Sequence, residues 1–587
     1  MHATTSPEPD RPSGSGASAV GAFQFVLHSH LPYCRRAGRW PHGEEWLHEA
    51  LAETYIPLLD VLYDLRERGT PCRMTLSMSP VLVEQLADPD VCANFVTYLD
   101  EEIEVSSRDV ARFAESGDAQ LHFLAGFYRD TYQAIKRSFS ERYGGDVIGA
   151  LRQLQDADCI EISTCAATHG YLPLLSRDAS IYAQLRAAVV SYERHFGRPP
   201  RAIWLPECAY RPAQRDPEGA LRPGIEAFLS AQGLRCFFVE TSAIEQGRPG
   251  YRPRAALALG SYALAEQRYQ AATGEAATAM LQAEAGGTTY RAYLVAEPDG
   301  AVSAPPVAVI GRNERTGMQV WSAEWGYPGD ADYREFHRKD PVSGLQYWRV
   351  TGPNADLGDK DVYHPDWAEA KIAQHAEHYA GLVEDLARDY YQQAGEYGLI
   401  SSNYDTELFG HWWFEGVRWI GQVLAHLAES PSVDLVTTSG YLEAHAPERA
   451  IALPEGSWGA GGTHWTWDNP DTHWMWAPIH AAERRMEQLV ARYPEAEGDA
   501  LAALNQAARE LLLLQSSDWP FLVTTGQAKE YATRRFNGHV SRFEQLAQAL
   551  EEGAHGRAGE LAATFFELDN VFPDLDYRWF AERQGQA

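Results

Sequence analysis

The chain has 587 residues, of which 45% are hydrophobic and 22% are charged, a composition typical of soluble globular proteins. This length exceeds that of one compact domain, so we expect a large catalytic domain accompanied by smaller ones. The formal net charge of -31 disfavours nucleic acid and anionic membrane surfaces as partners, because like charges repel. A neutral ligand meets no such repulsion.

The N-terminus and the cysteines predict a soluble cytoplasmic protein. Residues 1–20 are rich in Pro, Ser and Gly and lack an apolar segment, so we expect a disordered tail and not a signal peptide. The seven cysteines form no C-x-x-C pair, which is typical of reduced thiols. No run approaches the roughly 20 apolar residues of a membrane span.

Short β-prone runs recur along the chain, and helical patterns follow most of them. This alternation is typical of a parallel sheet, and about seven or eight such strands predict an α/β barrel of the TIM type. The predicted strands are residues 23–27, 73–77, 160–163, 203–205, 236–239, 319–322, 399–402 and 435–437. The predicted helices include residues 48–68, 367–390 and 412–427.

We place this barrel at residues 21–443, with two insertions. The helical pattern at about 100–155 predicts an inserted helical subdomain, whereas 251–306 is rich in Ala, Gly, Gln and Thr and is interpreted as a long loop or lid. From 444 to 587, helical patterns at 481–516 and 540–567 predict a C-terminal α-helical domain.

Two predicted strands end in a carboxylate surrounded by aromatic residues, namely Glu207 and Asp405. A buried carboxylate is costly unless it is used. Each has an ordinary interpretation, since Glu207 could be a solvated loop residue and Asp405 a helix N-cap. Together, at the ends of barrel strands where the chemistry of such folds occurs, they predict paired acid chemistry on a sugar.

The first predicted strand ends in His28-Ser29-His30. Alternate residues of a strand face the same side, so the two imidazoles could share a metal ion or bind sugar hydroxyls. Further candidate metal ligands are scattered, as His169 and His411 are, which favours the sugar-binding interpretation.

Five tryptophans lie within nineteen residues, at positions 458, 465, 467, 474 and 476, without helical spacing. Indole faces pack well against pyranose rings, although some of these side chains could simply fill a domain interface. Trp321, Trp325, Trp412 and Trp413 add to this set.

Several long motifs follow one another along the chain. They are HSHLPY at 28–33, EISTCAATHGYLPLL at 161–175, WLPECAYRP at 204–212, YDTELFGHWWFEG at 404–416, WDNPDTHW at 467–474 and SSDWPFL at 516–522. From about residue 21 to 580 the chain resembles glycoside hydrolase family 57, and within it the 1,4-α-glucan branching enzymes.

The resemblance implies a distorted (β/α)7 barrel, retention of anomeric configuration, and neither metal nor cofactor. Glu207 corresponds to the nucleophile and Asp405 to the general acid/base. The substrate would be an α-1,4-glucan such as amylose or glycogen, in a groove to which the C-terminal domain contributes, and the protein a monomer or small homo-oligomer. The implied substrate-binding residues are His28, His30, Trp46, His169, Trp321, Trp413, Trp467, Trp476 and Asp518.

One region departs from the family pattern. Branching members use a tyrosine at the tip of a mobile loop after the fifth strand, and here Ser242 stands where we expected a histidine, before a longer loop. Tyr251 and Tyr262 are both candidates for the tip. An α-amylase or 4-α-glucanotransferase of the same family is therefore the main alternative. A metal-dependent hydrolase or deacetylase and a non-catalytic glucan-binding protein are further ones.

Overall fold

The computed structural model describes residues 19–215, 221–245, 261–273, 286–296, 302–322 and 325–583. Strand β1 (Gly21–Ser29) lies at the centre, and all nine of its residues are buried. It pairs in parallel with β2 on one side and with β10 on the other. The barrel strands that follow β1 are β2 (Met74–Met78), β3 (Ile160–Ser163), β4 (Ala202–Ile203), β7 (Cys236–Val239), β9 (Ala308–Gly311) and β10 (Gly398–Asp405).

These strands belong to two sheets, one containing β10-β1-β2-β3 and the other β9-β7-β4. The sheets meet at both edges. Thr164, just after β3, pairs in parallel with Ile203 of β4, and the N–H of Asn313 after β9 donates to the carbonyl of Ser401 in β10 at 2.9 Å. The seven strands are therefore arranged as a distorted parallel barrel, which confirms the predicted fold class.

Two of the predicted strands differ from the structure. Residues 319–321 form the end of helix α11 (Glu314–Trp321), because the Asn313 side chain caps this helix by accepting from the N–H of Thr316. The strand of this region is β9, which the sequence analysis missed. Residues 435–437 only overlap β11, which pairs with the start of β1 outside the ring of seven. The remaining short strands are β5 (Gln214–Arg215), β6 (Leu221–Arg222), β8 (Ala292–Val295), β11 (Val433–Leu435) and β12 (Ala450–Ile451).

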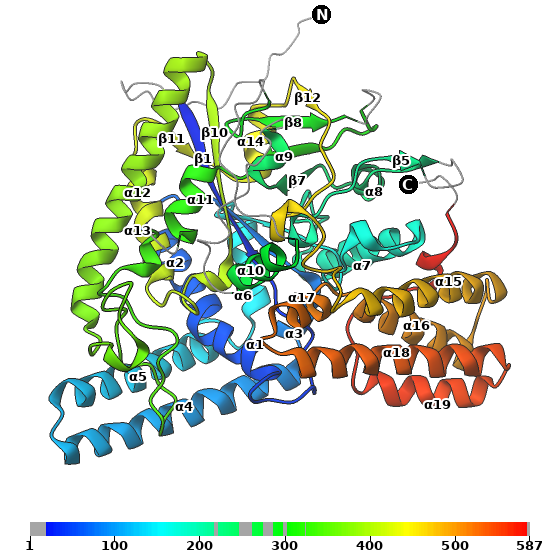
Figure 1. Ribbon diagram of the computed structural model, residues 1–587, viewed down its shortest axis with the longest axis horizontal. Helices are drawn as coiled ribbons and strands as arrows, with labels where there is room; N and C mark the ends of the chain where they lie inside the picture. Colours follow the sequence, from blue (N-terminus) through cyan, green and yellow to red (C-terminus); the bar gives the residue numbers. More distant parts are fainter. Residues whose placement is uncertain are drawn as a thin grey trace, which may run out of the picture.

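Helices cover the outside of the barrel (Figure 1). The long helix α12 runs along the face opposite to the C-terminal helices. The helices of this layer are α1 (Glu44–Ala50), α2 (Ile56–Glu67), α3 (Pro80–Leu86), α6 (Val147–Asp156), α7 (Asp178–Phe196), α8 (Ile225–Ala231), α9 (Thr241–Ile244), α10 (Ser261–Thr273), α11, α12 (Pro365–Ala394), α13 (Gly416–Ala428) and α14 (Thr438–Ala444). A π-helical segment, Leu51–Tyr55, joins α1 to α2. No described helix is long and apolar enough to cross a membrane.

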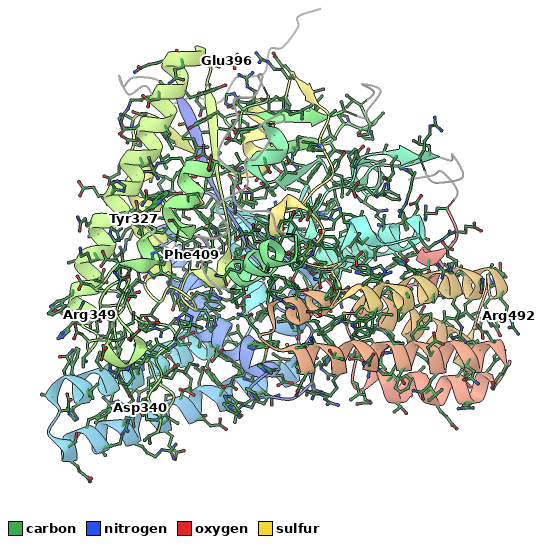
Figure 2. The ribbon with its side chains drawn as sticks, viewed as in Figure 1. Tyr327, Asp340, Arg349, Glu396, Phe409 and Arg492 are labelled. Carbon is green, nitrogen blue, oxygen red and sulfur yellow. The ribbon has the colours of Figure 1, made fainter. Side chains whose placement is uncertain are left out.

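Helices α4 (Pro89–Ser116) and α5 (Ala119–Arg137) form an antiparallel hairpin that projects below the barrel in Figure 1. Gly117 ends α4 in a left-handed conformation, with φ of 78°, and the Asp118 side chain then caps α5. The irregular segment 325–364 packs against this hairpin. In Figure 2 its Asp340 lies beside α4, where it accepts a hydrogen bond from Arg112 at 2.8 Å.

The C-terminal helices pack beside the barrel at the lower right of Figure 1. They are α15 (Trp476–Arg492), α16 (Gly498–Leu514), α17 (Asp518–Thr525), α18 (Lys529–Glu551) and α19 (His555–Phe566).

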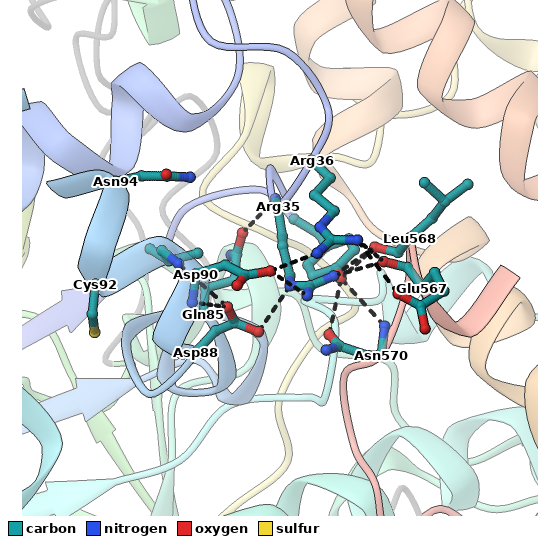
Figure 3. A network of polar contacts seen from close by, with 12 residues as sticks. Arg35, Arg36, Gln85, Asp88, Asp90, Cys92, Asn94, Glu567, Leu568 and Asn570 are labelled. Atoms are coloured by element: carbon teal, nitrogen blue, oxygen red, sulfur yellow. Dashed lines mark hydrogen bonds and ion pairs between the residues drawn. The ribbon is translucent and has the colours of Figure 1, made fainter. Parts of the chain in front are cut away.

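The loop after β1 fastens these helices to the barrel (Figure 3). Arg35 donates to Asp88 at 2.8 Å and to Asp90 at 3.0 Å, near the start of α4, and also to the carbonyl of Glu567 at 2.9 Å. The neighbouring Arg36 contacts Asp90 and Glu567 as well. This loop directly follows the strand-end histidines. These hydrogen bonds and ion pairs therefore hold the C-terminal domain in place relative to the histidines.

Candidate active site

A cavity of about 400 Å³ opens at the carboxyl ends of the barrel strands. Its walls come from the ends of β1 and β10, the loop after β4, the segment between α11 and α12, and the start of α17. Both predicted catalytic carboxylates, Glu207 and Asp405, line this one cavity. The barrel therefore brings together two groups that are far apart in the sequence.

Glu207 lies just after β4 in a left-handed backbone conformation, with φ of 60° and ψ of 25°. This conformation is uncommon for a residue with a side chain and clusters at functional sites. Its buried carboxylate accepts hydrogen bonds from the indole Nε1 of Trp458 at 2.6 Å and from the Ser517 hydroxyl at 3.4 Å. The backbone N–H of Trp458 also donates to the Glu207 carbonyl. Two distant segments thus orient the carboxylate.

Asp405 ends β10, and the parallel register of β10 with β1 places it opposite His28. Burial raises the pKa of Asp405 well above its ordinary value, and the negative charges of Glu407 and Glu207 raise it further. Among the described residues, no cation lies within 4 Å of its carboxylate. The raised pKa favours the protonated form of this side chain, which a general acid requires.

The three predicted histidines lie together on one side of the cavity. The rings of His30 and His169 stack with centroids 3.8 Å apart, and Nε2 of His28 is 3.1 Å from Nε2 of His169. His28 also stacks on Trp204 at 4.9 Å. With Cys165, His28 and His169 form a group that could hold a metal ion.

The pKa values of these histidines are shifted in opposite directions. Burial and the nearby His30 lower the pKa values of His28 and His169 well below the ordinary value. Burial opposes protonation of His30 too, but Asp518, whose Oδ1 is 2.9 Å from Nε2, raises the pKa of His30 above its ordinary value. Asp518 begins α17, so the C-terminal domain supplies the counter-ion of a barrel histidine.

Glu407 is a third carboxylate of the cavity that the sequence analysis missed. It accepts hydrogen bonds from the backbone N–H of His30 at 3.2 Å and from the Tyr55 hydroxyl. Burial raises the pKa of Glu407 to about 7. Tyr55 closes the π-helical segment, and such segments are frequent at functional sites.

Part of the cavity wall is aromatic and basic. Phe336 stacks on Trp412 with centroids 4.4 Å apart, and both side chains line the cavity with Trp321 and Arg334. Trp321 is one of the residues that the sequence analysis predicted to bind substrate. Arg334 is held by Glu53 of the π-helical segment at 3.2 Å. Segment 325–364, which supplies Arg334 and Phe336, has no periodic pattern that could have indicated this role.

Four of the tryptophans predicted to bind substrate are not among the cavity-lining residues. Trp413, Trp467 and Trp476 are almost fully buried in the cores of the barrel and the C-terminal domain, where Trp467 stacks on Tyr171. Trp46 packs edge-on against Tyr531. Trp412, which directly precedes Trp413, and Trp458 line the cavity instead.

Of the two tyrosines proposed for the tip of the lid, Tyr251 lies outside the described residues. Tyr262 is in the described backbone of α10, but its side chain lies outside the described part. The C-terminal domain lines the cavity through Asp518, Phe521 and Leu522 of α17.

Comparison with known proteins decides the family. Residues 24–454 match glycosyl hydrolase family 57, and residues 478–580 match the C-terminal region of 1,4-α-glucan branching enzymes. The chain belongs to glycoside hydrolase family 57. The family region spans the whole barrel, and the second match covers the C-terminal helices from α15 to α19.

Two curated members of the family match most of the chain. The 1,4-α-glucan branching enzyme TK1436 of Thermococcus kodakarensis is 44% identical over 535 residues, which are 90% of this chain and 74% of that protein. The probable 1,4-α-glucan branching enzyme Rv3031 of Mycobacterium tuberculosis is 30% identical over 586 residues, covering 96% of this chain and 99% of the relative.

Solved structures of the family share the fold over nearly the whole length. The branching enzyme of Pyrococcus horikoshii has a TM-score of 0.82 at 40% identity, covering 97% of this chain and 98% of its own. The α-amylase AmyC of Thermotoga maritima has a TM-score of 0.77 at 29% identity, with 96% and 99% covered.

Proposed function

We propose that this family 57 protein is a 1,4-α-glucan branching enzyme, which cleaves an α-1,4 linkage and transfers the released glucan segment to a 6-hydroxyl as an α-1,6 branch. The observation that carries the proposal is the pair of unlike carboxyls in one cavity: Glu207, fixed by two hydrogen-bond donors, and Asp405, whose pKa is raised by burial and by the negative charges of Glu407 and Glu207. The printed names of the curated relatives support the choice of reaction.

In the first step, Asp405 donates its proton to the glycosidic oxygen that leaves. Glu207 attacks the anomeric carbon at the same time and forms a covalent glycosyl-enzyme, so the bond to the leaving sugar breaks as the bond to the carboxylate forms. The donors to Glu207, the Trp458 indole and the Ser517 hydroxyl, set its direction of attack. They do not need to reorganise during the reaction.

In the second step, the ionised Asp405 removes the proton of an incoming 6-hydroxyl, which then attacks the anomeric carbon and releases Glu207. Water competes for the same intermediate. The stacked Trp412 and Phe336, with Trp321, offer apolar faces on which acceptor sugar rings can pack and displace water. Asp518 and His30, which are hydrogen-bonded to each other, provide hydrogen-bonding groups for sugar hydroxyls.

Hydrolysis is the second candidate activity, because the α-amylase AmyC shares the fold at 29% identity. Amylose incubated with the enzyme and followed by proton NMR separates the activities. We expect α-1,6 linkages to accumulate with few new reducing ends. Reducing ends without α-1,6 linkages would instead identify a hydrolase. If neither product accumulated, the protein would be a 4-α-glucanotransferase or inactive. The Glu207→Gln variant is the control and should give neither product.

A further inference from the structure

At the catalytic cavity, three side chains near the carboxyl ends of β1 and β3 point toward one another. They are His28, His169 and the fully buried Cys165, and their ligand atoms lie within 4.8 Å of one another. The Nε2 atoms of the two imidazoles are 3.1 Å apart. Two nitrogens bound to one tetrahedral zinc ion are separated by about 3.3 Å, given zinc–nitrogen distances of 2.0–2.1 Å.

The hydrogen bonds of His28 decide where its proton lies. The Ser77 hydroxyl donates to the carbonyl of Thr164 at 3.2 Å, so its oxygen accepts from Nδ1 of His28, 3.2 Å away. The neutral ring of His28 is therefore protonated at Nδ1. Its Nε2 presents a lone pair to His169.

His169 is held by a serine as well. The Ser517 hydroxyl lies 2.7 Å from Nδ1 of His169 and 3.4 Å from the Glu207 carboxylate. The Nε2 atoms of His28 and His169 are 3.1 Å apart and share a hydrogen bond. A metal ion between these nitrogens would replace that hydrogen bond, with His169 carrying its proton at Nδ1 so that each ring offers a lone pair. In metal sites, ligating histidines are oriented in this way, by a hydrogen bond from the other ring nitrogen.

We propose that His28, His169 and Cys165 form a binding site for a soft transition-metal ion of the zinc type. Two neutral imidazoles and a thiolate are ligands that such ions prefer, and three protein ligands leave one coordination position open. Binding releases one proton, because the Cys165 thiol must become a thiolate while the metal–sulfur bond forms.

A metal at this place would inhibit the enzyme. It would draw His28 and His169 toward Cys165 and away from the cavity that both imidazoles line. It would also disturb Ser517, which links His169 to Glu207. Cys165 does not line the cavity and has no part in the proposed reaction, so its removal should leave the basal activity intact.

The test uses Co²⁺, whose bond to a thiolate gives a charge-transfer absorption, and Zn²⁺ as the inhibitor. The purified, chelator-treated full chain should bind one Co²⁺ with a thiolate band, and Zn²⁺ should displace it and inhibit branching reversibly. Cys165→Ala should abolish the band and weaken inhibition roughly 100-fold. Cys236→Ala is the matched control, because Cys236 is equally buried on β7 but outside the group, and it should behave as the wild type.

Cys165→Ser preserves the side-chain volume and tests whether the thiol itself is needed; it should also lose the band. Absence of a thiolate–cobalt band in the wild type would overturn the proposal. A band or zinc sensitivity unchanged in Cys165→Ala would do the same. The spectrum reads metal binding without turnover, so this result stands apart from whether the enzyme forms branches.

Discussion

The molecule contains two buried clusters of charged side chains, one in the C-terminal domain and one in the active site. The C-terminal cluster, Glu510, His539, Arg542 and Asp569, joins helices α16 and α18 to the segment after α19. Arg542 lies 3.0 Å from Glu510 and 2.8 Å from Asp569, and His539 lies 2.8 Å from Glu510. Each carboxylate has a cation at contact distance, and neither lines the catalytic cavity.

The active-site cluster is organised in the opposite way. Glu207, Asp405 and Glu407 share one cavity, and no cation lies within 4 Å of the Asp405 carboxylate in the described part of the chain. Burial raises the pKa of Asp405, and it also raises the pKa of Glu510 in the C-terminal cluster.

A raised pKa therefore does not by itself distinguish a catalytic carboxyl from a structural one, since burial produces it in both places. The distinguishing features are the counter-ion and the cavity. Glu510 is enclosed with the guanidinium of Arg542, whereas Asp405 faces a space large enough for sugar rings.

The largest effect is expected from Asp405→Asn, which cannot donate or accept the proton of the reaction. We expect the turnover number on amylose to fall by about 10³- to 10⁴-fold. In the wild type, activity should decline as the pH rises through the raised pKa of Asp405, because the acid form is lost. If Asp405→Asn kept the wild-type turnover number and the same loss of activity at high pH, that result would contradict the role given to Asp405.

In the C-terminal cluster, Arg542→Met leaves Glu510 and Asp569 without their shared cation. Removing one partner of a buried ion pair costs about 3–5 kcal/mol of stability, so the melting temperature should fall markedly while the folded enzyme keeps its turnover number. Arg485→Met is the matched control, because it removes ion pairs to two exposed glutamates and should cost under about 1 kcal/mol. Equal losses of stability in Arg542→Met and Arg485→Met would mean that the buried cluster contributes no more to stability than the exposed ion pairs.

Glu407 links stability to pH. Its folded pKa of about 7 lies above the ordinary value of 4.5, so the folded protein retains a proton that the unfolded chain releases. Stability from this group is present below pH 4.5 and is lost as the pH rises through 7, by at most roughly 3 kcal/mol. Glu407→Gln should therefore gain stability relative to the wild type between pH 5 and 8, measured as the difference in melting temperature.

Glu335 is the control for this titration, because it lines the same cavity with the opposite shift. Burial opposes its ionisation, but hydrogen bonds from His337 and a contact with Lys360 lower the pKa of Glu335 to about 2. Its stabilisation is lost only as the pH falls toward 2. Glu335→Gln should thus differ from the wild type by a constant amount between pH 5 and 8.

The smallest effect concerns orientation of the nucleophile. Trp458→Phe removes the indole donor to Glu207, and a hydrogen bond to a charged group is worth about 1.5–3 kcal/mol, so turnover should fall by roughly 10- to 100-fold. Trp467→Phe is the control, since the indole nitrogen of Trp467 has no hydrogen-bond partner among the described residues. Similar losses in both would mean that Trp458 acts through packing alone.

Much of the fold could be predicted, because buried strands such as β1 and β10 begin with short β-prone runs and are followed by helical patterns. The strand β9 was missed because its four residues follow a Pro-rich part of the Ala- and Gly-rich insertion. Residues 319–322 resemble a strand in composition, but the Asn313 cap, which acts locally, makes residues 319–321 helical.

The candidate site was predictable where function requires unusual residues at strand ends, as at Glu207, Asp405 and His28. It was not predictable for the aromatic wall. Trp412 and Trp413 are adjacent in the sequence, and only packing decides that the first lines the cavity and the second fills the core. Arg334 reaches the cavity from an irregular segment, which carries no periodic signal.

In the proposed mechanism, Glu207 forms a covalent bond to the sugar while Asp405 moves the proton. Asp405→Ala can be treated with an α-maltosyl fluoride, whose leaving group needs no acid, and the protein then digested and analysed by mass spectrometry. We expect a maltosyl adduct on the peptide containing Glu207, because Asp405→Ala lacks the base that the second step needs to release the sugar. Release of fluoride without any adduct, or an adduct on another carboxylate, would contradict it.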